Sequence, residues 1–228
     1  MAKNKKLKTP STSLATQSNK LIEASYKMSV PAKRVMLMLL AQIHPLQQDI
    51  SGRIRIEAAD YSKKTGVSSS QSYRDIKNGC RELMSTIITT KNPAARTTQE
   101  CVVVHWMEYH ESEGWLEATF TPWIAPFIHK LHGIGYKTIE INEALKFKRF
   151  YTIRLYELLM QWDSSCLRLI TLKDLRKAFD IENKTYTAFK DFRVKVLEPS
   201  IKEIEQKTQW KIKYQSKKTG NKITSFSF

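Results

Sequence analysis

The same order of predicted elements occurs twice along the chain, and this repeat limits the possible folds more than any other feature. The order is a buried helix, a short strand, a helix-turn-helix and a β-hairpin. Ile56 and Asp60 in the first copy have counterparts in Ile170 and Asp174, about 114 residues later. Because each copy carries its own apolar faces, the repeat predicts two similar units rather than one domain with a tail.

The first unit begins with a helix that Ser29 and Pro31 open, since proline is tolerated in the first turn of a helix. The run Val35–Leu40 makes this helix largely buried, and Pro45 ends it. Residues 53–56 then alternate between arginine and isoleucine, which predicts a short strand.

A helix-turn-helix follows this strand. Its first helix starts at Glu57 and breaks at Gly66, and the serines after Val67 are suitable N-caps for a second helix that ends near Leu83. The apolar inner face of the second helix consists of Ile76, Cys80 and Leu83. Three β-rich runs come next and predict a hairpin or a small sheet: residues 86–90, 101–106 and 115–120.

The second unit repeats this order. We expect a long helix over residues 145–162, a short strand at 167–170 and a helix capped by Thr171. A second helix begins near Tyr186 and runs to about Lys207. Pro199 predicts a kink or a break within it, because proline removes an interior hydrogen bond.

The chain ends in a predicted hairpin. Residues 210–214 and 223–228 alternate between apolar and polar side chains, as strands with one buried face do. Residues 217–221 supply the turn, in which Gly220 adopts a positive φ.

A helix-turn-helix followed by a hairpin is a winged helix, so the sequence predicts an α+β fold of two tandem winged-helix domains. Each domain is a helix-turn-helix with a β-hairpin wing. The polar, lysine-rich residues 1–18 are expected to form a flexible basic arm. We place the N-terminal domain at residues 19–138 and the C-terminal domain at residues 139–228.

The charge of the chain points to a partner. Lys and Arg number 38 and Asp and Glu 22, which gives a formal net charge of +16. Part of this excess is concentrated in residues 184–228 and in the first nine residues. Nucleic-acid phosphates attract such clusters, although a solvated basic surface is the simpler alternative.

The second helix of the C-terminal unit is the strongest candidate for reading DNA. A recognition helix buries one face and presents the other to a major groove about 12 Å wide. Ideal helical geometry puts Lys190 and Lys195 toward solvent but Arg193 within the apolar arc. The candidate DNA-binding residues of this helix, its approach and its wing are Lys184, Tyr186, Thr187, Lys190, Arg193, Lys195, Lys217, Lys218, Asn221 and Lys222.

The matching helix of the N-terminal unit carries a milder charge. It either contacts base edges as well or touches mainly the DNA backbone. Its candidate residues are Ser69, Gln71, Tyr73, Arg74 and Lys77.

One pattern suggests a leucine zipper but does not support one. Five apolar residues are spaced by seven: Leu7, Leu14, Leu21, Met28 and Val35. Pro10 and Pro31 interrupt any single helix, and no second apolar stripe accompanies the first along most of its length.

The sequence offers little support for catalysis or for a metal. It contains no G-x-x-x-x-G-K-[ST] loop for nucleotides. His105 and His110 flank Glu108, but on a strand His105 and Glu108 point to opposite faces, and His129 with His132 makes at most half a site. A nicking enzyme would need paired histidines and a nucleophilic tyrosine, and no His-x-His occurs. We therefore expect a DNA-binding protein without catalytic residues, cofactor or metal.

Cysteine usage and hydropathy suggest a compartment. Cys80, Cys101 and Cys166 lie far apart and are odd in number, which favours free thiols in a reducing environment. No apolar run approaches the length of a membrane span, and the N-terminus lacks the features of a signal peptide. We expect a cytoplasmic protein.

Several segments resemble a known family. They are SNKLIEA at residues 18–24, VPAKRVM at 30–36, RLYELL at 154–159, DFR at 191–193 and the terminal FSF. In this order and spacing they resemble the iteron-binding plasmid replication initiators of the RepA, RepE and pi type, over nearly the whole chain beyond the arm. Relatives carry an arginine-rich run where this chain has Arg193, Val194 and Lys195, and this departure favours Arg193 and Lys195 over Val194 as readers.

The resemblance implies a pair of winged helices and a specific biological role. Monomers of the family bind directly repeated origin sites, the iterons, through both domains. Dimers, joined mainly through the N-terminal domain, bind an inverted repeat and repress the initiator's own promoter. Host initiation and helicase-loading proteins are the implied partners, and origin opening the implied outcome. A transcription repressor without a replication role would use the same residues and remains the alternative.

Overall fold

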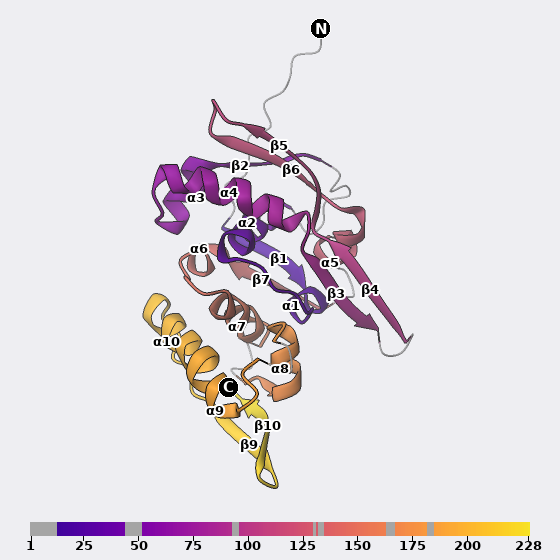
Figure 1. The fold of residues 1–228 in the computed structure, drawn as a ribbon, viewed down its shortest axis with the longest axis vertical. Helices are drawn as coiled ribbons and strands as arrows, with labels where there is room; N and C mark the ends of the chain where they lie inside the picture. The colour runs from indigo at the N-terminus through magenta and orange to yellow at the C-terminus, as the bar shows by residue number, and fades with distance from the viewer. Residues whose placement is uncertain are drawn as a thin grey trace.

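The two predicted units are both present in the fold (Figure 1). The computed structural model describes residues 13–43, 52–92, 96–129, 131, 135–162, 167–181 and 185–228. Within these ranges, each helix is too short or too polar to span a bilayer.

The first unit follows the predicted order with one insertion. Its elements are α2 (Val30–Leu40), β2 (Ile54–Glu57), α3 (Ala58–Thr65), α4 (Ser69–Leu83), β5 (Val104–His110) and β6 (Trp115–Phe120). The inserted hairpin, β3 (Ile87–Asn92) with β4 (Thr97–Val102), lies between α4 and β5 and projects from the body in Figure 1. The run predicted at 101–106 therefore divides between β4 and β5.

The second unit has the same plan. Its elements are α7 (Phe150–Met160), β8 (Leu169–Thr171), α8 (Leu172–Ala178), α9 (Phe189–Phe192), a π-helical segment (Arg193–Leu197), α10 (Glu198–Lys207), β9 (Gln215–Thr219) and β10 (Lys222–Ser227). Both units close with a three-stranded antiparallel sheet, ordered β2-β6-β5 in the first and β8-β10-β9 in the second. This identical strand order confirms the repeat and the tandem winged-helix fold.

Local sequence signals explain where the helices begin and end. The side chains of Ser29, Ser68 and Thr171 each accept a hydrogen bond from the backbone N–H three residues later, which caps α2, α4 and α8. Gly66 ends α3 with a φ of 76°, a left-handed conformation that glycine adopts without strain. The tight turn between α3 and α4 follows from this glycine.

We expected residues 1–18 to form a flexible arm, and the structure contradicts this for the last five of them. Leu14–Ser18 form β1, which pairs antiparallel with β7 (Tyr136–Glu140). Four of the five β1 residues are buried, and the polar side chains of two of them have partners inside the protein: Thr16 contacts Thr138 at 2.9 Å, and Gln17 donates to Glu157 at 2.9 Å. Residues 1–12 lie outside the described residues.

A connecting layer joins the two units. It consists of β1, α1 (Asn19–Ile22), the 3-10 helix Pro122–Ile124, α5 (Ala125–Ile128), β7 and α6 (Ile141–Ala144). A single cluster of buried apolar side chains runs through this layer into both units. The domain boundary that we expected between residues 138 and 139 falls inside β7.

Two further expectations are wrong at the level of single elements. The helix expected to start at residue 145 starts at Phe150, because residues 145–149 form a turn that buries Phe147. Residues 210–214 do not form a strand: Trp210 and Tyr214 pack on the core with alternating exposure, but the hydrogen-bonded strand β9 begins at Gln215. Alternation of apolar and polar residues indicates which side chains are buried, but a strand also needs a neighbouring strand to form backbone hydrogen bonds with.

Two further expectations, on the zipper pattern and on the cysteines, fit the residues that the structure describes. Leu14 lies in β1, Leu21 in α1 and Val35 in α2, so the seven-residue spacing is no zipper. Cys80 and Cys101 are free thiols, and Cys166 lies outside the described residues.

Candidate nucleic-acid interface

The second recognition helix runs from Phe189 to Lys207 as α9, the π-helical segment and α10 without interruption. Pro199 stands in the first turn of α10, directly after the π-helical segment. The wider π turn precedes the position at which proline removes an N–H, so the helix continues past it instead of breaking.

This helix exposes the cations predicted to read DNA. Phe192, Val196 and Ile204 are buried on its inner side. Lys190, Arg193 and Lys195 are exposed. Arg193 escapes the apolar arc that ideal geometry assigned to it, because the π-helical segment begins at this residue and changes the angle per residue.

Weak ion pairs orient two of these cations. Arg193 Nε lies 3.3 Å from Glu198 Oε1, and Lys195 Nζ lies 3.2 Å from Asp191 Oδ1. All four side chains are about half exposed, and pairs of this kind contribute roughly 0–1 kcal/mol. A phosphate or a guanine edge can therefore replace either carboxylate at little cost.

The approach to this helix has an unusual backbone held by one arginine. Tyr186 has a φ of 51°. Arg176 donates to the carbonyl oxygens of Thr185 at 2.7 Å and Tyr186 at 2.9 Å. Thr187 is exposed and Tyr186 half-buried, just before α9. Lys184 lies outside the described residues.

The second wing carries positive charge and no acid. Its turn is shorter than expected: Lys222 pairs with Thr219, so only Gly220 and Asn221 form the tip, and Gly220 has a φ of 59°. Lys217 and Lys218 are exposed on β9 rather than in the turn. Because neighbouring strand residues point to opposite faces, these two lysines leave the strand on different sides of the wing.

An aromatic cluster fixes the wing to the recognition helix. The rings of Phe189 and Phe226 stack with centroids 5.8 Å apart, and Tyr214 lies 6.2 Å from Phe226. Phe228 lies 5.8 Å from Tyr214. The helix and the wing are thereby held as one surface.

The first recognition helix, α4, exposes fewer free cations. Ser69 and Arg74 are exposed, but Arg74 donates to Gln71 at 2.9 Å, and Gln71 in turn donates to the buried carboxylate of Asp75. Lys77 is paired with Glu111 at 2.8 Å.

Tyr73 and the first wing add little positive charge. Tyr73 is half-buried. Glu111 and Glu113 lie beside the tip of the first wing, where Gly114 makes the turn. The guanidinium groups of Arg53 and Arg55 lie over the rings of Trp106 and Trp115, with 4.4 and 3.6 Å from the guanidinium carbon to the ring centroids. This unit presents a more nearly neutral surface than the second.

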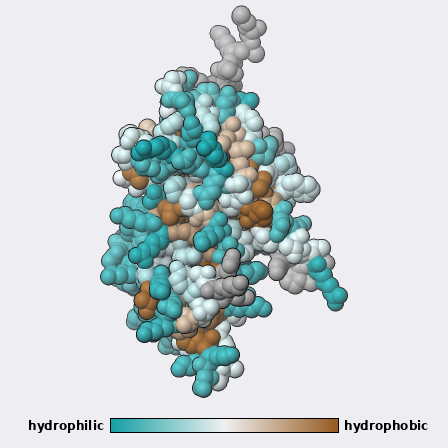
Figure 2. Space-filling view, viewed as in Figure 1, coloured by the Kyte–Doolittle hydropathy of each residue, from teal (hydrophilic) through white to brown (hydrophobic). Residues whose placement is uncertain are grey.

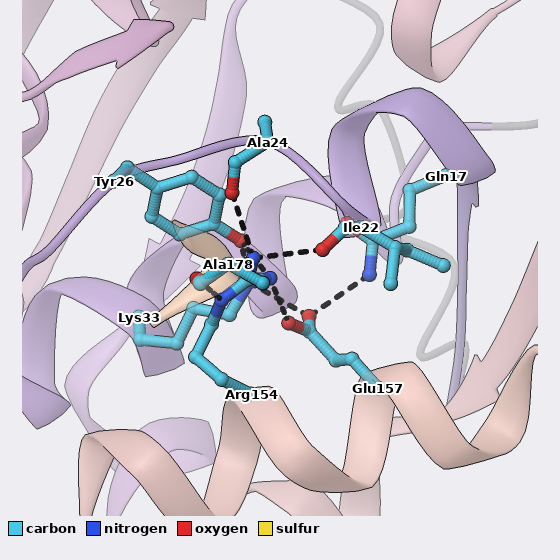
Figure 3. Close-up of polar contacts among 8 residues, drawn as sticks. All are labelled: Gln17, Ile22, Ala24, Tyr26, Lys33, Arg154, Glu157 and Ala178. Atoms are coloured by element: carbon cyan, nitrogen blue, oxygen red, sulfur yellow. Dashed lines mark hydrogen bonds and ion pairs between the residues drawn. The ribbon is translucent and has the colours of Figure 1, made fainter. Parts of the chain in front are cut away.

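A buried network holds the two units together (Figure 3). Arg154 on α7 donates to the carbonyl oxygens of Ile22 in α1 and Ala24 just after it at 2.7 and 2.9 Å, and to that of Ala178 in the second unit at 3.1 Å. Its Nη1 also lies 2.8 Å from Glu157 Oε2. Arg154 thus bridges two parts of the chain that are far apart in sequence.

Glu157 is the one acid of this network. Lys33 Nζ lies 2.7 Å from Glu157 Oε1, and all three charged side chains are fully buried. Burial alone would raise the pKa of Glu157, but Lys33 and Arg154 together hold it below its ordinary value. The network therefore carries one negative and two positive charges.

Sequence reasoning missed a third basic segment between the two recognition helices. Lys146, Lys148 and Arg149 are exposed in the turn between α6 and α7. The signal was present as the run KFKR, but we assigned it to a helix, where its charges would have been spread around the axis. Among the described residues, no group of three or more His, Cys, Asp or Glu side chains is arranged to hold a metal.

Comparison with known proteins assigns both units. The model of the initiator replication protein WH1 domain matches residues 14–160, and that of the initiator Rep protein WH2 domain matches residues 171–228. The chain is 28% identical to the PI protein of Escherichia coli over 84% of this chain and 73% of that protein. An uncharacterized 27.6 kDa protein of Escherichia coli is 27% identical over 97% of this chain and 95% of its own length.

The fold is also similar to a solved structure. The Pi initiator protein in a crystal with iteron DNA aligns with a TM-score of 0.82 and 24% identity, covering 95% of this chain and 96% of that one. The likeness extends over both winged helices.

Proposed function

The chain belongs to the initiator replication protein family, and from this premise we propose that it initiates plasmid replication by binding iterons as a monomer through both winged helices. The observation that carries the proposal is the pairing of two helix-turn-helix units in one continuous core, the second with an exposed basic helix and wing. The similar Pi initiator has been crystallised with iteron DNA, which supports the same ligand for this chain.

In this proposal the second winged helix, from α7 to β10, is the main reader. Lys190, Arg193 and Lys195 enter a major groove, where they contact guanine edges or clamp phosphates. Lys184, Tyr186 and Thr187 contact the DNA at the start of the helix. The wing residues Lys217, Lys218, Asn221 and Lys222 follow the adjacent backbone or minor groove.

The first winged helix, from α2 to β6, contributes backbone contacts, and the N-terminal part of the chain contributes dimerisation. Ser69, Gln71, Tyr73, Arg74 and Lys77 are the proposed contact residues of α4. Because several of them already bond to one another or to Glu111, they position the DNA more than they discriminate its sequence.

We further propose the regulatory cycle of the family. The dimer binds an inverted-repeat operator and represses the initiator's own promoter, while the monomer opens the origin and recruits host initiation and helicase-loading proteins. The protein acts in the cytoplasm as a binder without catalytic activity, cofactor or metal.

Selection of bound sequences from a random duplex library tests the proposal. We expect a directly repeated site of about two helical turns. A footprint should show protection of both DNA segments that the two recognition helices contact. No enriched sequence at moderate salt would refute the proposal. Binding without support of origin-dependent plasmid replication would instead identify a transcription repressor.

Single substitutions test the reading helix. Lys195→Ala or Arg193→Ala should weaken specific binding by roughly 1–3 kcal/mol if the side chain meets a base, and should relax the preference at that position. Lys20→Ala, an exposed lysine on α1, removes the same charge and serves as the matched control. Weaker binding with unchanged sequence preference would show that the residue contacts a phosphate.

A further inference from the structure

A compact basic turn lies between the two reading units. It connects α6 to α7 and contains Lys146, Lys148 and Arg149 around the buried ring of Phe147. In Figure 1 this connection lies between α3 and α4 on one side and the C-terminal end of α10 on the other. Figure 2 shows a predominantly hydrophilic surface on this flank of the molecule at mid-height.

Contacts from both units fix the backbone of the turn. Arg34 on α2 donates to the carbonyl oxygen of Phe147 at 3.0 Å. Glu203 on α10 accepts from the backbone N–H of Lys148 at 2.6 Å, and Lys207 donates to the carbonyl oxygen of Lys146. The turn is therefore preorganised, although it belongs to no regular element.

Glu203 is committed to this task. Its second oxygen accepts from Thr152 Oγ1 at 2.7 Å in the first turn of α7, and the residue is buried. The turn itself, KFKR, contains no carboxylate that could neutralise its three cations. Within the described ranges, Lys146, Lys148 and Arg149 form no ion pair with an acid.

Two hollows connect the turn to the two recognition helices. Lys146 and Lys148 line one of them together with Thr65–Val67, the turn that leads into α4. Arg149 lines the other with Lys27 and with Lys195 of the second recognition helix. The three cations thus occupy the surface between the two helix-turn-helix units.

We propose that Lys146, Lys148 and Arg149 bind the DNA phosphates between the two major-groove segments that the recognition helices occupy. On one face of B-DNA such segments lie about 34 Å apart, and the backbone of the intervening minor groove faces the protein. Cations fixed between two readers would contact these phosphates only when both readers are seated. The inference rests on the proposed function. It implies that the turn favours DNA in which the two sites for the recognition helices are correctly spaced.

The test replaces all three side chains with glutamine and compares salt dependence. Each lost phosphate contact makes the slope of log K against log salt shallower by about 0.9, so the variant K146Q/K148Q/R149Q should lose roughly 2–3 in slope. The control K20Q/K211Q/K213Q removes the same charge from exposed lysines away from the turn, and should keep most of the slope. The base preference of both variants should match that of the wild type.

Phosphate ethylation gives a second readout on the selected site. Ethyl groups on the central phosphates should impair binding of the wild type and leave the glutamine variant unaffected. An unchanged slope and interference pattern in a folded variant, with the wild type binding its repeat, would overturn this inference alone. An equal loss of slope in the control would overturn it as well. If the wild type selects no sequence, both the proposed function and the phosphate contacts of the turn that depend on it are refuted.

Discussion

Glu157→Gln should destabilise the protein far more than removal of Lys33, one of the two cations that Glu157 neutralises. The cluster of Lys33, Glu157 and Arg154 carries a net charge of +1 in a site closed to solvent. The glutamine variant leaves two buried cations without an anion. Lys33→Met instead leaves a neutral pair, Glu157 with Arg154 at 2.8 Å.

The contacts set the size of the effect. Glu157 accepts from Lys33 at 2.7 Å, from Gln17 at 2.9 Å and from Arg154 at 2.8 Å. Loss of a buried anion from such a cluster costs roughly 3–5 kcal/mol, because the remaining charges are uncompensated. In a chain of this size each kcal/mol lowers the Tm by about 2–4 °C, so the Tm should fall by about 10 °C. Lys33→Met removes one donor and should cost about 1–2 kcal/mol.

Urea unfolding and thermal melts followed by circular dichroism measure both variants. Arg53→Ala, which breaks an exposed pair with Glu108 at 3.3 Å, is the control and should change stability by no more than about 1 kcal/mol. Equal losses for Glu157→Gln and Lys33→Met, or a stable glutamine variant, would refute the charge argument.

Three further predictions concern acid stability, helix packing and thiol reactivity. The pKa of Glu157 is lower in the folded protein than in the unfolded chain, where it is about 4.3, so the ionised carboxylate stabilises the fold above that pH. This contribution is lost as the pH falls through the folded-state pKa of Glu157. The wild type should therefore lose more stability than Glu157→Gln in acid titrations followed by fluorescence. Gly79→Ala should lower the free energy of unfolding in urea by roughly 1–3 kcal/mol, because the new Cβ would lie 3.0 Å from the backbone of Pro31. Gly52→Ala is the control and should not lower it, because the space around Gly52 is open. Equal stability of the two variants would contradict the close packing of Gly79 on Pro31. Burial raises the pKa of Cys80 to about 12, so iodoacetamide at pH 8 should label it only after unfolding, as peptide mass spectrometry can follow, and rapid labelling of the native thiol would disprove its burial.

The corrections in the N-terminal and C-terminal segments have one cause. Sequence patterns predict whether a residue is exposed or buried, but they do not identify the distant residue that contacts it. Residues 1–18 are mostly polar, which predicts an arm, yet Thr16 and Gln17 are buried because Thr138 and Glu157, more than 120 residues away, satisfy them. Residues 210–214 alternate like a strand without pairing as one.

The candidate site divides in the same way. The sequence was sufficient to locate the second recognition helix and its wing, because lysines interrupt an apolar periodicity there. The exposure of Arg193 depends on the π-helical segment, and the paired state of Lys77 depends on Glu111 in the first wing. The basic turn at residues 146–149 depends on contacts from α2 and α10, which no local pattern contains.

Local chemistry in the sequence determined the doubled order of elements, the capped helices, the glycine turns and the positive second unit. Each of these follows from interactions within about ten residues, which a pattern can record. Tertiary structure alone decided that Lys33, Arg154 and Glu157 share one buried site and that β1 joins β7. Those choices require charges and backbone groups from distant segments to satisfy one another away from water, and only the folded chain brings them together.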